Sequence, residues 1–174
     1  MKNRIPAIAV ACVVAAFLAG CAARGTIGVV SEPEGAEKSV LIASQGSRFK
    51  GLVVDRVSSE LLDRGIAVRA IPLVRLRDVD ATRYDAVLLV NTVTRWSLNH
   101  RVTRFLDEYP DRNRVVILST AGDPEWRAGI PDAITSASGP ENAGAVANDL
   151  VARIDRILET RIRDEKVENP SRTP

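Results

Sequence analysis

The chain has 174 residues, of which 45% are hydrophobic and 26% are charged, and its formal net charge at pH 7 is +2. Lys2 and Arg4 account for that excess, since 24 − 2 leaves 22 Lys and Arg against 22 Asp and Glu. A neutral remainder gives no electrostatic reason to expect nucleic-acid binding. The chain has two cysteines, Cys12 and Cys21, both near the N-terminus. Because no cysteine follows Cys21, a disulfide framework, a cysteine nucleophile and a cysteine metal site are excluded for the rest of the chain.

The first 21 residues have the pattern of an export signal. Lys2 and Arg4 form a basic start, residues 7–18 are apolar, and small residues precede Cys21. Two alternatives are an ordinary secretory signal and a membrane span, although the apolar run is shorter than the ~20 residues that a span requires. Residues 18–21 (LAGC) resemble the lipobox of bacterial lipoproteins.

That resemblance implies that residues 1–20 form a signal peptide, which is removed. Cys21 then becomes the first mature residue and carries the lipid that anchors the chain to a membrane of the cell envelope. Lipoproteins of Gram-negative bacteria that stay in the inner membrane typically have aspartate after the cysteine. Here that residue is Ala22, which favours the outer membrane, with the domain facing the periplasm.

Residues 38–163 are predicted to form one domain of alternating strands and helices. Residues 22–37 mix Gly, Pro and Glu without periodicity and are predicted to be a tether. Residues 164–174 are charged and predicted to be a disordered tail. Apolar runs predict strands at 39–43, 66–71, 86–90 and 115–118, with a weaker fifth at 133–137. Helical spacing predicts helices around 53–61, 98–109 and 146–162, and residues 73–84 are predicted to form a loop or one helical turn.

Two local signals predict where helices end and begin. Gly65 is expected to supply a left-handed cap after the first helix. Ser138 and Glu141 have the spacing of a capping box before the last helix. Between Thr120 and Ala133 there are too few residues for a full crossover helix. Either the fourth helix is reduced or missing, or the fifth strand begins later or docks differently.

The alternation of apolar strands with helices predicts an α/β fold with a parallel sheet covered on both faces. In such sheets, ligands bind beyond the carboxyl ends of the strands, at the point where the strand order reverses. That rule directs attention to three loops, at 44–50, 91–97 and 119–126.

Several stretches within residues 38–162 resemble flavodoxin-like domains. Residues 40–43, with the loop and helix that end at 60–65, are similar to the opening of that family. Residues 84–90 are similar to its third strand, and residues 115–123 to its fourth strand and flavin-flanking loop. The resemblance implies a flavodoxin-like, doubly wound parallel sheet of strand order 2-1-3-4-5, in three layers, and it implies FMN as the cofactor.

The first loop is the candidate phosphate site. Backbone N–H groups at a helix N-terminus, together with small hydroxyl side chains, form a cradle for an anion. By resemblance to the flavodoxin loop, Arg48 replaces a glycine and Lys50 replaces a threonine, and both cations either pair with a phosphate or are solvated. The candidate phosphate-binding residues are Ser44, Gly46, Ser47, Arg48 and Lys50.

The second and third loops contain both tryptophans of the chain. By resemblance, Trp96, Gly122, Asp123 and Trp126 are the candidate residues around a flavin ring, with Trp126 at the position of the outer stacking residue. An alternative is that both tryptophans only pack over the loop edges.

The leading hypothesis is a lipid-anchored protein whose flavodoxin-like domain binds FMN or a related phosphate-bearing ligand and transfers electrons to an unidentified partner. The rival hypothesis is a cofactor-free envelope protein with a structural or protein-interaction role.

Two other signals do not indicate a site. Residues 47–50 match Ser-x-x-Lys, the nucleophile motif of penicillin-binding proteins, but the chain has no Lys-Thr-Gly to accompany it. His100 is the only histidine, and neither a second histidine nor a cysteine completes a metal site with it.

Overall fold

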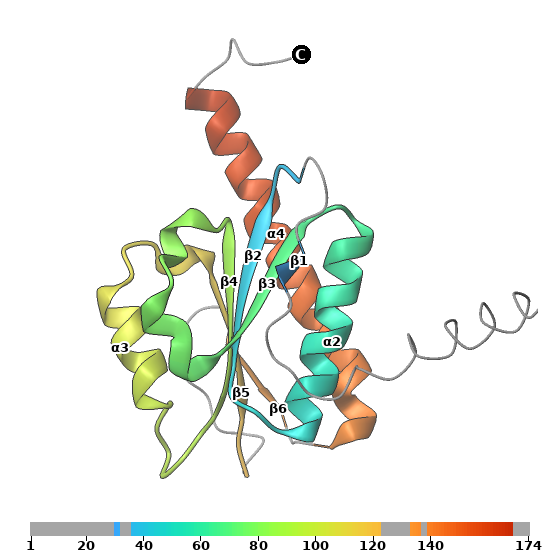
Figure 1. Ribbon diagram of the computed structural model, residues 1–174, viewed down its shortest axis with the longest axis vertical. Helices are drawn as coiled ribbons and strands as arrows, with labels where there is room; N and C mark the ends of the chain where they lie inside the picture. Colours follow the sequence, from blue (N-terminus) through green and yellow to red (C-terminus); the bar gives the residue numbers. More distant parts are fainter. Residues whose placement is uncertain (1–29, 32–35, 123–132, 137–138, 169–174) are drawn as a thin grey trace, which may run out of the picture.

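A sheet covered by helices on both faces forms the framework of the protein (Figure 1). The computed structural model describes residues 30–31, 36–122, 133–136 and 139–168. Within these ranges the strands are β1 (Val30–Ser31), β2 (Ser39–Ser44), β3 (Ala67–Pro72), β4 (Ala86–Thr92), β5 (Val115–Thr120) and β6 (Ala133–Ser136).

The order of the strands across the sheet is β1-β3-β2-β4-β5-β6. β1 runs antiparallel to β3, and every other neighbouring pair is parallel. In their order along the chain, the five parallel strands are therefore arranged 2-1-3-4-5, which confirms the predicted doubly wound α/β fold.

Different kinds of helix cover the two faces of the sheet. On one face, α2 (Arg48–Asp63) packs beside α4 (Ala143–Glu168). On the other face, α3 (His100–Glu108) lies beside the 3-10 helices η2 (Leu73–Asp78) and η3 (Ala81–Arg83) (Figure 1). Two further 3-10 turns, η4 (Arg112–Arg114) and η5 (Pro140–Asn142), precede β5 and α4. Most of the connection from β5 to β6, where a reduced helix is expected, lies outside the described residues.

The central strands supply a hydrophobic core to each face, because successive side chains of a strand point to opposite sides. In β2, Val40 and Ile42 join the core under α2 and α4, and Leu41 and Ala43 join the core under η2 and α3. All four side chains are fully buried. This burial on both faces explains why β2 and β4 appear in the sequence as continuous apolar runs.

Three features differ from the predicted boundaries. β1 lies within the segment predicted as a tether, where Val30 pairs with Arg69 in β3. α4 continues to Glu168, although residues 164–174 are predicted to be a tail. α4 begins at Ala143, after η5, which is later than the capping-box spacing predicts. Ser138 lies outside the described residues.

The strand register brings three chain segments to one edge of the sheet. Ser44, the last residue of β2, pairs with Val90 in β4, and Thr92 at the end of β4 pairs with Thr120 at the end of β5. The chain then leaves β2 toward α2 on one face and leaves β4 toward α3 on the other. The β2–β4 boundary is therefore the switch point, where doubly wound sheets bind ligands.

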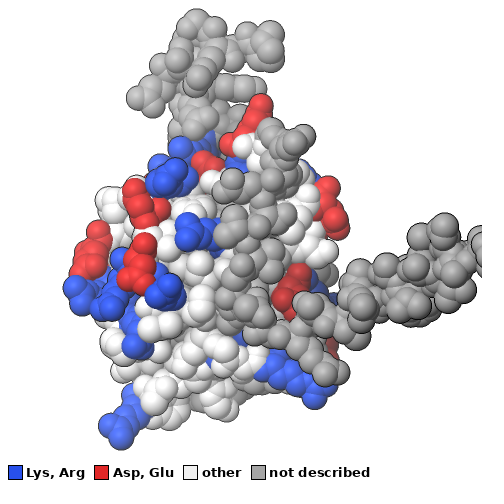
Figure 2. All heavy atoms as spheres, in the orientation of Figure 1, with Lys and Arg blue, Asp and Glu red and all other residues white. Residues whose placement is uncertain are grey.

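Basic and acidic side chains are interspersed over η2 and α3, on the left side of the molecule in Figure 2.

No helix within the described residues is both long enough and apolar enough to span a membrane.

Candidate functional site

The loop from β2 to α2 is short and ends in a capped helix. Ser47 is the N-cap of α2, and its Oγ accepts a hydrogen bond of 3.2 Å from the Lys50 amide. Gly46, Ser47 and Arg48 are exposed, and a Cβ built on Gly46 would have no neighbour within 4 Å. As far as the described residues show, the backbone at Gly46 is therefore accessible to a ligand.

The loop also offers backbone donors. Within the described residues, no acceptor is recorded for the amide N–H groups of Gly46, Ser47, Arg48 and Phe49. The first amides of any helix have no partner inside the helix, and their dipoles give that end a partial positive charge. The N-terminus of α2 therefore has the donors that an anion requires.

Lys50, in the first turn of α2, is the most unusual residue of the candidate phosphate site. Its side chain is 3% exposed, and its Nζ donates a hydrogen bond to Oγ1 of Thr92, at the end of β4. Burial lowers the pKa of Lys50 below its ordinary value of 10.5. Within the described part of the chain, no carboxylate forms an ion pair with this amine. Of the two cations in the loop, only Arg48 is exposed to solvent.

A polar network links the three strand ends, and apart from Ser44 and Lys50 its residues are not among those predicted from the sequence. Gln45 Oε1 accepts hydrogen bonds from the Thr92 amide at 3.1 Å and from Asn99 Nδ2 at 3.5 Å. Asn91 Nδ2 donates to the Leu118 carbonyl and to Ser119 Oγ in β5, and Asn91 Oδ1 accepts from the Asn99 amide. Polar residues at the ends of apolar strands are the sequence signal for this network.

The network continues to the hydroxyl that holds Lys50. Thr120 Oγ1 lies 3.3 Å from the Asn91 carbonyl and 3.4 Å from Thr92 Oγ1. Asn91 and Ser119 are fully buried, and Ser44, Lys50 and Thr120 are at most 3% exposed. Buried polar groups that bond to one another hold the three strand ends in a fixed arrangement. The sheet edge under the loops is therefore polar and rigid.

Trp96 lies at the tip of a tight turn beyond β4. Thr94 and Ser97 exchange backbone hydrogen bonds of 3.0 and 3.1 Å, and the two residues between them have positive φ angles, 52° for Arg95 and 62° for Trp96. Turns of this kind strongly favour Asn and Gly, because other side chains are strained there. Trp96 is 69% exposed. Its indole is therefore largely in solvent and does not pack over the loop edge.

The structure describes only part of the expected ring site. Thr92 and Thr120 pair, and the Val93 amide donates to the Thr120 carbonyl at 2.9 Å, so the second and third loops start side by side. Gly122 is exposed just after β5. Asp123 and Trp126 lie outside the described residues. No cluster of potential metal ligands occurs in the part of the chain that the structure describes.

Comparison with known proteins supports the fold and leaves the family open. No family model matches the chain, and no curated protein matches it. A metal-soaked flavodiiron core from Synechocystis is similar, with a TM-score of 0.52 and 8% identity over 74% of this chain. This chain covers 38% of that protein's length.

Two flavodoxins are also similar. One, from an archaeon, has a TM-score of 0.49 and 8% identity over 68% of this chain and 98% of its own. The other, a variant from Pseudomonas aeruginosa, has a TM-score of 0.46 and 14% identity over 67% of this chain and 99% of its own. The two flavodoxins carry no argument at these TM-scores. At 8% identity the likeness to the flavodiiron core concerns the fold alone, and together with the strand order it identifies a flavodoxin-like α/β domain.

Proposed function

We propose that the edge formed by the ends of β2, β4 and β5 binds FMN or a related phosphate-bearing ligand. The observation that carries this proposal is the buried Lys50 amine, which has a hydroxyl partner in Thr92 and no carboxylate partner among the described residues. Burying a charged amine without a counter-ion costs several kcal/mol. A phosphate that binds at the adjacent helix N-terminus supplies the missing negative charge.

Each part of the loop then has a role in holding the phosphate. The amides of residues 46–49, which have no acceptor among the described residues, donate to its oxygens, and the Ser47 hydroxyl and the exposed Arg48 guanidinium add further donors. The open space beside Gly46 allows the phosphate to approach the backbone. Lys50 supplies charge from below the loop, and Ser44 lines the end of β2.

Trp96 supplies the ring contact in this proposal. An exposed indole offers a flat apolar face, which suits stacking on an isoalloxazine. Maintaining two residues with positive φ angles at a surface turn is unfavourable, and such strain is concentrated at functional sites. Gly122, Asp123 and Trp126 are proposed to form the other side of the ring site. When bound, FMN supplies the electron-transfer chemistry, and the protein positions and shields it.

The phosphate assignment is tested by comparing FMN with riboflavin, which lacks the phosphate. The protein from residue 22 onward, without Cys21, is titrated into each flavin while flavin fluorescence is followed. We expect FMN to bind more tightly than riboflavin and Ser47→Glu to abolish the difference, because a carboxylate at the N-cap repels the phosphate. Ser59→Glu makes the same change at an exposed position of α2 about three turns away from the N-cap and is the control. Equal affinities for the two flavins would contradict the assignment.

We also propose that a lipid on Cys21 anchors the protein in the cell envelope, most simply at the outer membrane with the domain in the periplasm. The residues that support this are the LAGC sequence and Ala22. Two acyl chains are enough for stable anchoring. We expect an alkyne-tagged fatty acid to label the wild type and not Cys21→Ser, and Ala22→Asp to shift the protein to the inner membrane. A labelled Cys21→Ser variant would overturn the lipid assignment.

A further inference from the structure

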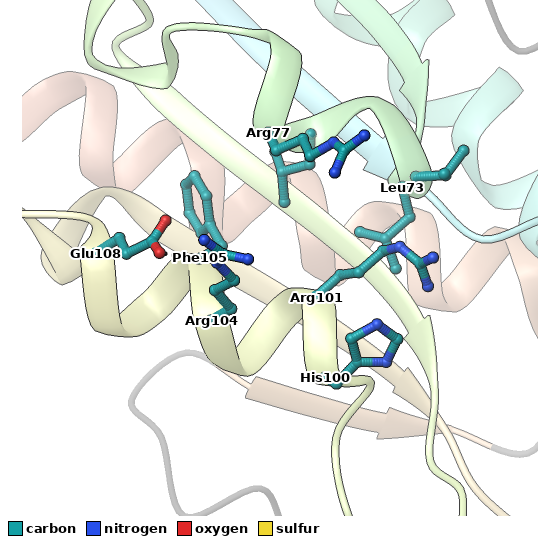
Figure 3. Close-up of a pocket in the computed structure, with 9 residues that line it drawn as sticks. Leu73, Arg77, His100, Arg101, Arg104, Phe105 and Glu108 are labelled. Atoms are coloured by element: carbon teal, nitrogen blue, oxygen red, sulfur yellow. Dashed lines mark hydrogen bonds and ion pairs between the residues drawn. The ribbon is translucent and has the colours of Figure 1, made fainter.

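A cavity of about 430 Å³ lies between η2 and α3, on the face of the sheet opposite α2 and α4. Figure 3 shows that Leu73 and Arg77 reach it from η2, and that Arg101, Arg104 and Phe105 reach it from α3. The cavity shares none of its lining residues with the candidate flavin site. Its volume lies within the ~300–1,000 Å³ typical of small-molecule pockets.

The cavity exists because the crossover from β3 to β4 contains only short 3-10 helices. η2 has six residues and η3 has three, where a doubly wound sheet usually has a full α-helix. Leu73 and Leu76 line the cavity from η2 and are themselves buried, whereas Val74 on η2 is 54% exposed and Phe105 on α3 is only partly covered. The short helices therefore leave an apolar floor in which Val74 and Phe105 are within reach of solvent.

Arginines form the rim of this floor, and one of them has no ion pair within the described residues. Arg104 Nε pairs with Glu108 at 2.8 Å, and Arg77 Nε lies 3.5 Å from Asp78. For Arg101, no ion pair is recorded among the described residues. Arg101 also lies in the first turn of α3, where the amide dipoles add positive potential. One end of the cavity therefore favours a negative charge, and its floor favours an apolar group.

We propose that this cavity binds a small amphipathic anion, free in solution, that combines an acyl or aromatic tail with one carboxylate or phosphate group. The tail lies on Val74 and Phe105, beside the buried Leu73 and Leu76, and the charged group pairs with Arg101. Charge complementarity selects the anion, and burial of the tail supplies most of the affinity. This proposal does not depend on flavin binding.

The test uses octanoate as the probe and His100 as the reporter. His100 lines the cavity beside Arg101 and is the only histidine of the chain, so a histidine-labelled protein gives one set of ring signals. The full chain, purified without a histidine tag, is placed in zwitterionic nanodiscs and titrated with octanoate. We expect a saturable shift of the His100 signal. Neutral octanol and tail-less acetate are expected to give much weaker responses.

Two charge-reversal variants distinguish binding of octanoate in the cavity from a general effect of the protein's net charge on octanoate binding. Arg101→Glu is expected to weaken octanoate binding roughly tenfold or more. Arg83→Glu makes the same change at an exposed arginine on η3 outside the cavity and is expected to bind like the wild type. Equal binding of octanol and octanoate, or equal loss in the two variants, would overturn the proposal. Arg101-dependent binding to anionic vesicles without any octanoate response would also overturn it, and would indicate a membrane-contact face.

Discussion

At the scale of single residues, we expect the Lys50 amine to lower the stability of the fold and to raise its affinity for FMN. Its amine is buried beside Thr92, and burial lowers its pKa. Lys50→Met keeps the shape and removes the charge. We expect the variant to be more stable at pH 7 by roughly 1 kcal/mol, since replacing buried charge by apolar atoms is often stabilising. We also expect it to bind FMN roughly 10- to 100-fold more weakly, through loss of a charged hydrogen bond. Urea unfolding and flavin titration measure the two effects, and a destabilised variant with unchanged FMN affinity would contradict this account.

The same residue predicts a pH dependence of stability. In the unfolded chain Lys50 keeps its proton up to about pH 10.5, whereas in the folded state it releases the proton at lower pH. Between the two pKa values the unfolded state binds more protons, so stability rises with pH and levels off above 10.5. Other groups titrate there too, so the prediction concerns the difference between the wild type and Lys50→Met. A difference that stays constant across this range would show that the pKa of Lys50 is not lowered.

Trp96 allows strain and ring binding to be separated. Trp96→Gly and Arg95→Gly each remove one side chain from a left-handed position, so we expect each to raise the free energy of unfolding by about 1 kcal/mol. Only Trp96→Gly removes the indole. If the indole stacks on a flavin, FMN binding weakens in Trp96→Gly and stays near the wild-type level in Arg95→Gly. Equal flavin affinity in both variants would mean that Trp96 has another role.

At the scale of elements, the two ends of α2 are defined by different chemistry. Ser47 caps its start. At its end, Gly65 has a φ angle of 73°, its amide bonds to the Leu62 carbonyl, and the Ile66 amide bonds to the Leu61 carbonyl. This pair of bonds is the Schellman motif, which requires a residue in the left-handed region. The prediction of a left-handed cap at Gly65 is confirmed.

Two identical substitutions in this region are expected to have opposite effects. Gly65→Ala places a Cβ in a left-handed conformation and is expected to destabilise the protein by about 1 kcal/mol. Gly51→Ala lies inside α2, where a Cβ has no neighbour within 4 Å, and is expected to stabilise it by about 0.5–1 kcal/mol. Urea unfolding at pH 7 measures both changes. Effects of the same sign would show that backbone conformation does not determine them.

Some elements were predictable and others were not, for physical reasons. β2 and β4 are buried on both faces, so their apolar runs identify them directly. β1 consists of two residues and exists through pairing with β3, a distant contact that local sequence does not encode. The 3-10 helices between β3 and β4 have weak periodicity, so residues 73–84 predict only a loop or one turn.

At the scale of the whole molecule, the topology assembles the candidate site. Residues near 45, 91 and 120 are far apart in sequence, and they meet because β2, β4 and β5 are adjacent and parallel. The rule for ligand position in doubly wound sheets predicted this meeting. Local sequence did not predict the burial of the Lys50 side chain or its hydrogen bond to Thr92, because both depend on the register of β2 and β4.

Binding of a phosphate-bearing flavin at this edge of the sheet is tested by an FMN titration of the wild-type protein from residue 22 onward, without Cys21. Quenching of flavin fluorescence follows the binding. We expect saturable quenching with one FMN per chain at micromolar or tighter affinity. No quenching at hundreds of micromolar FMN would contradict it and would favour the cofactor-free role in the cell envelope.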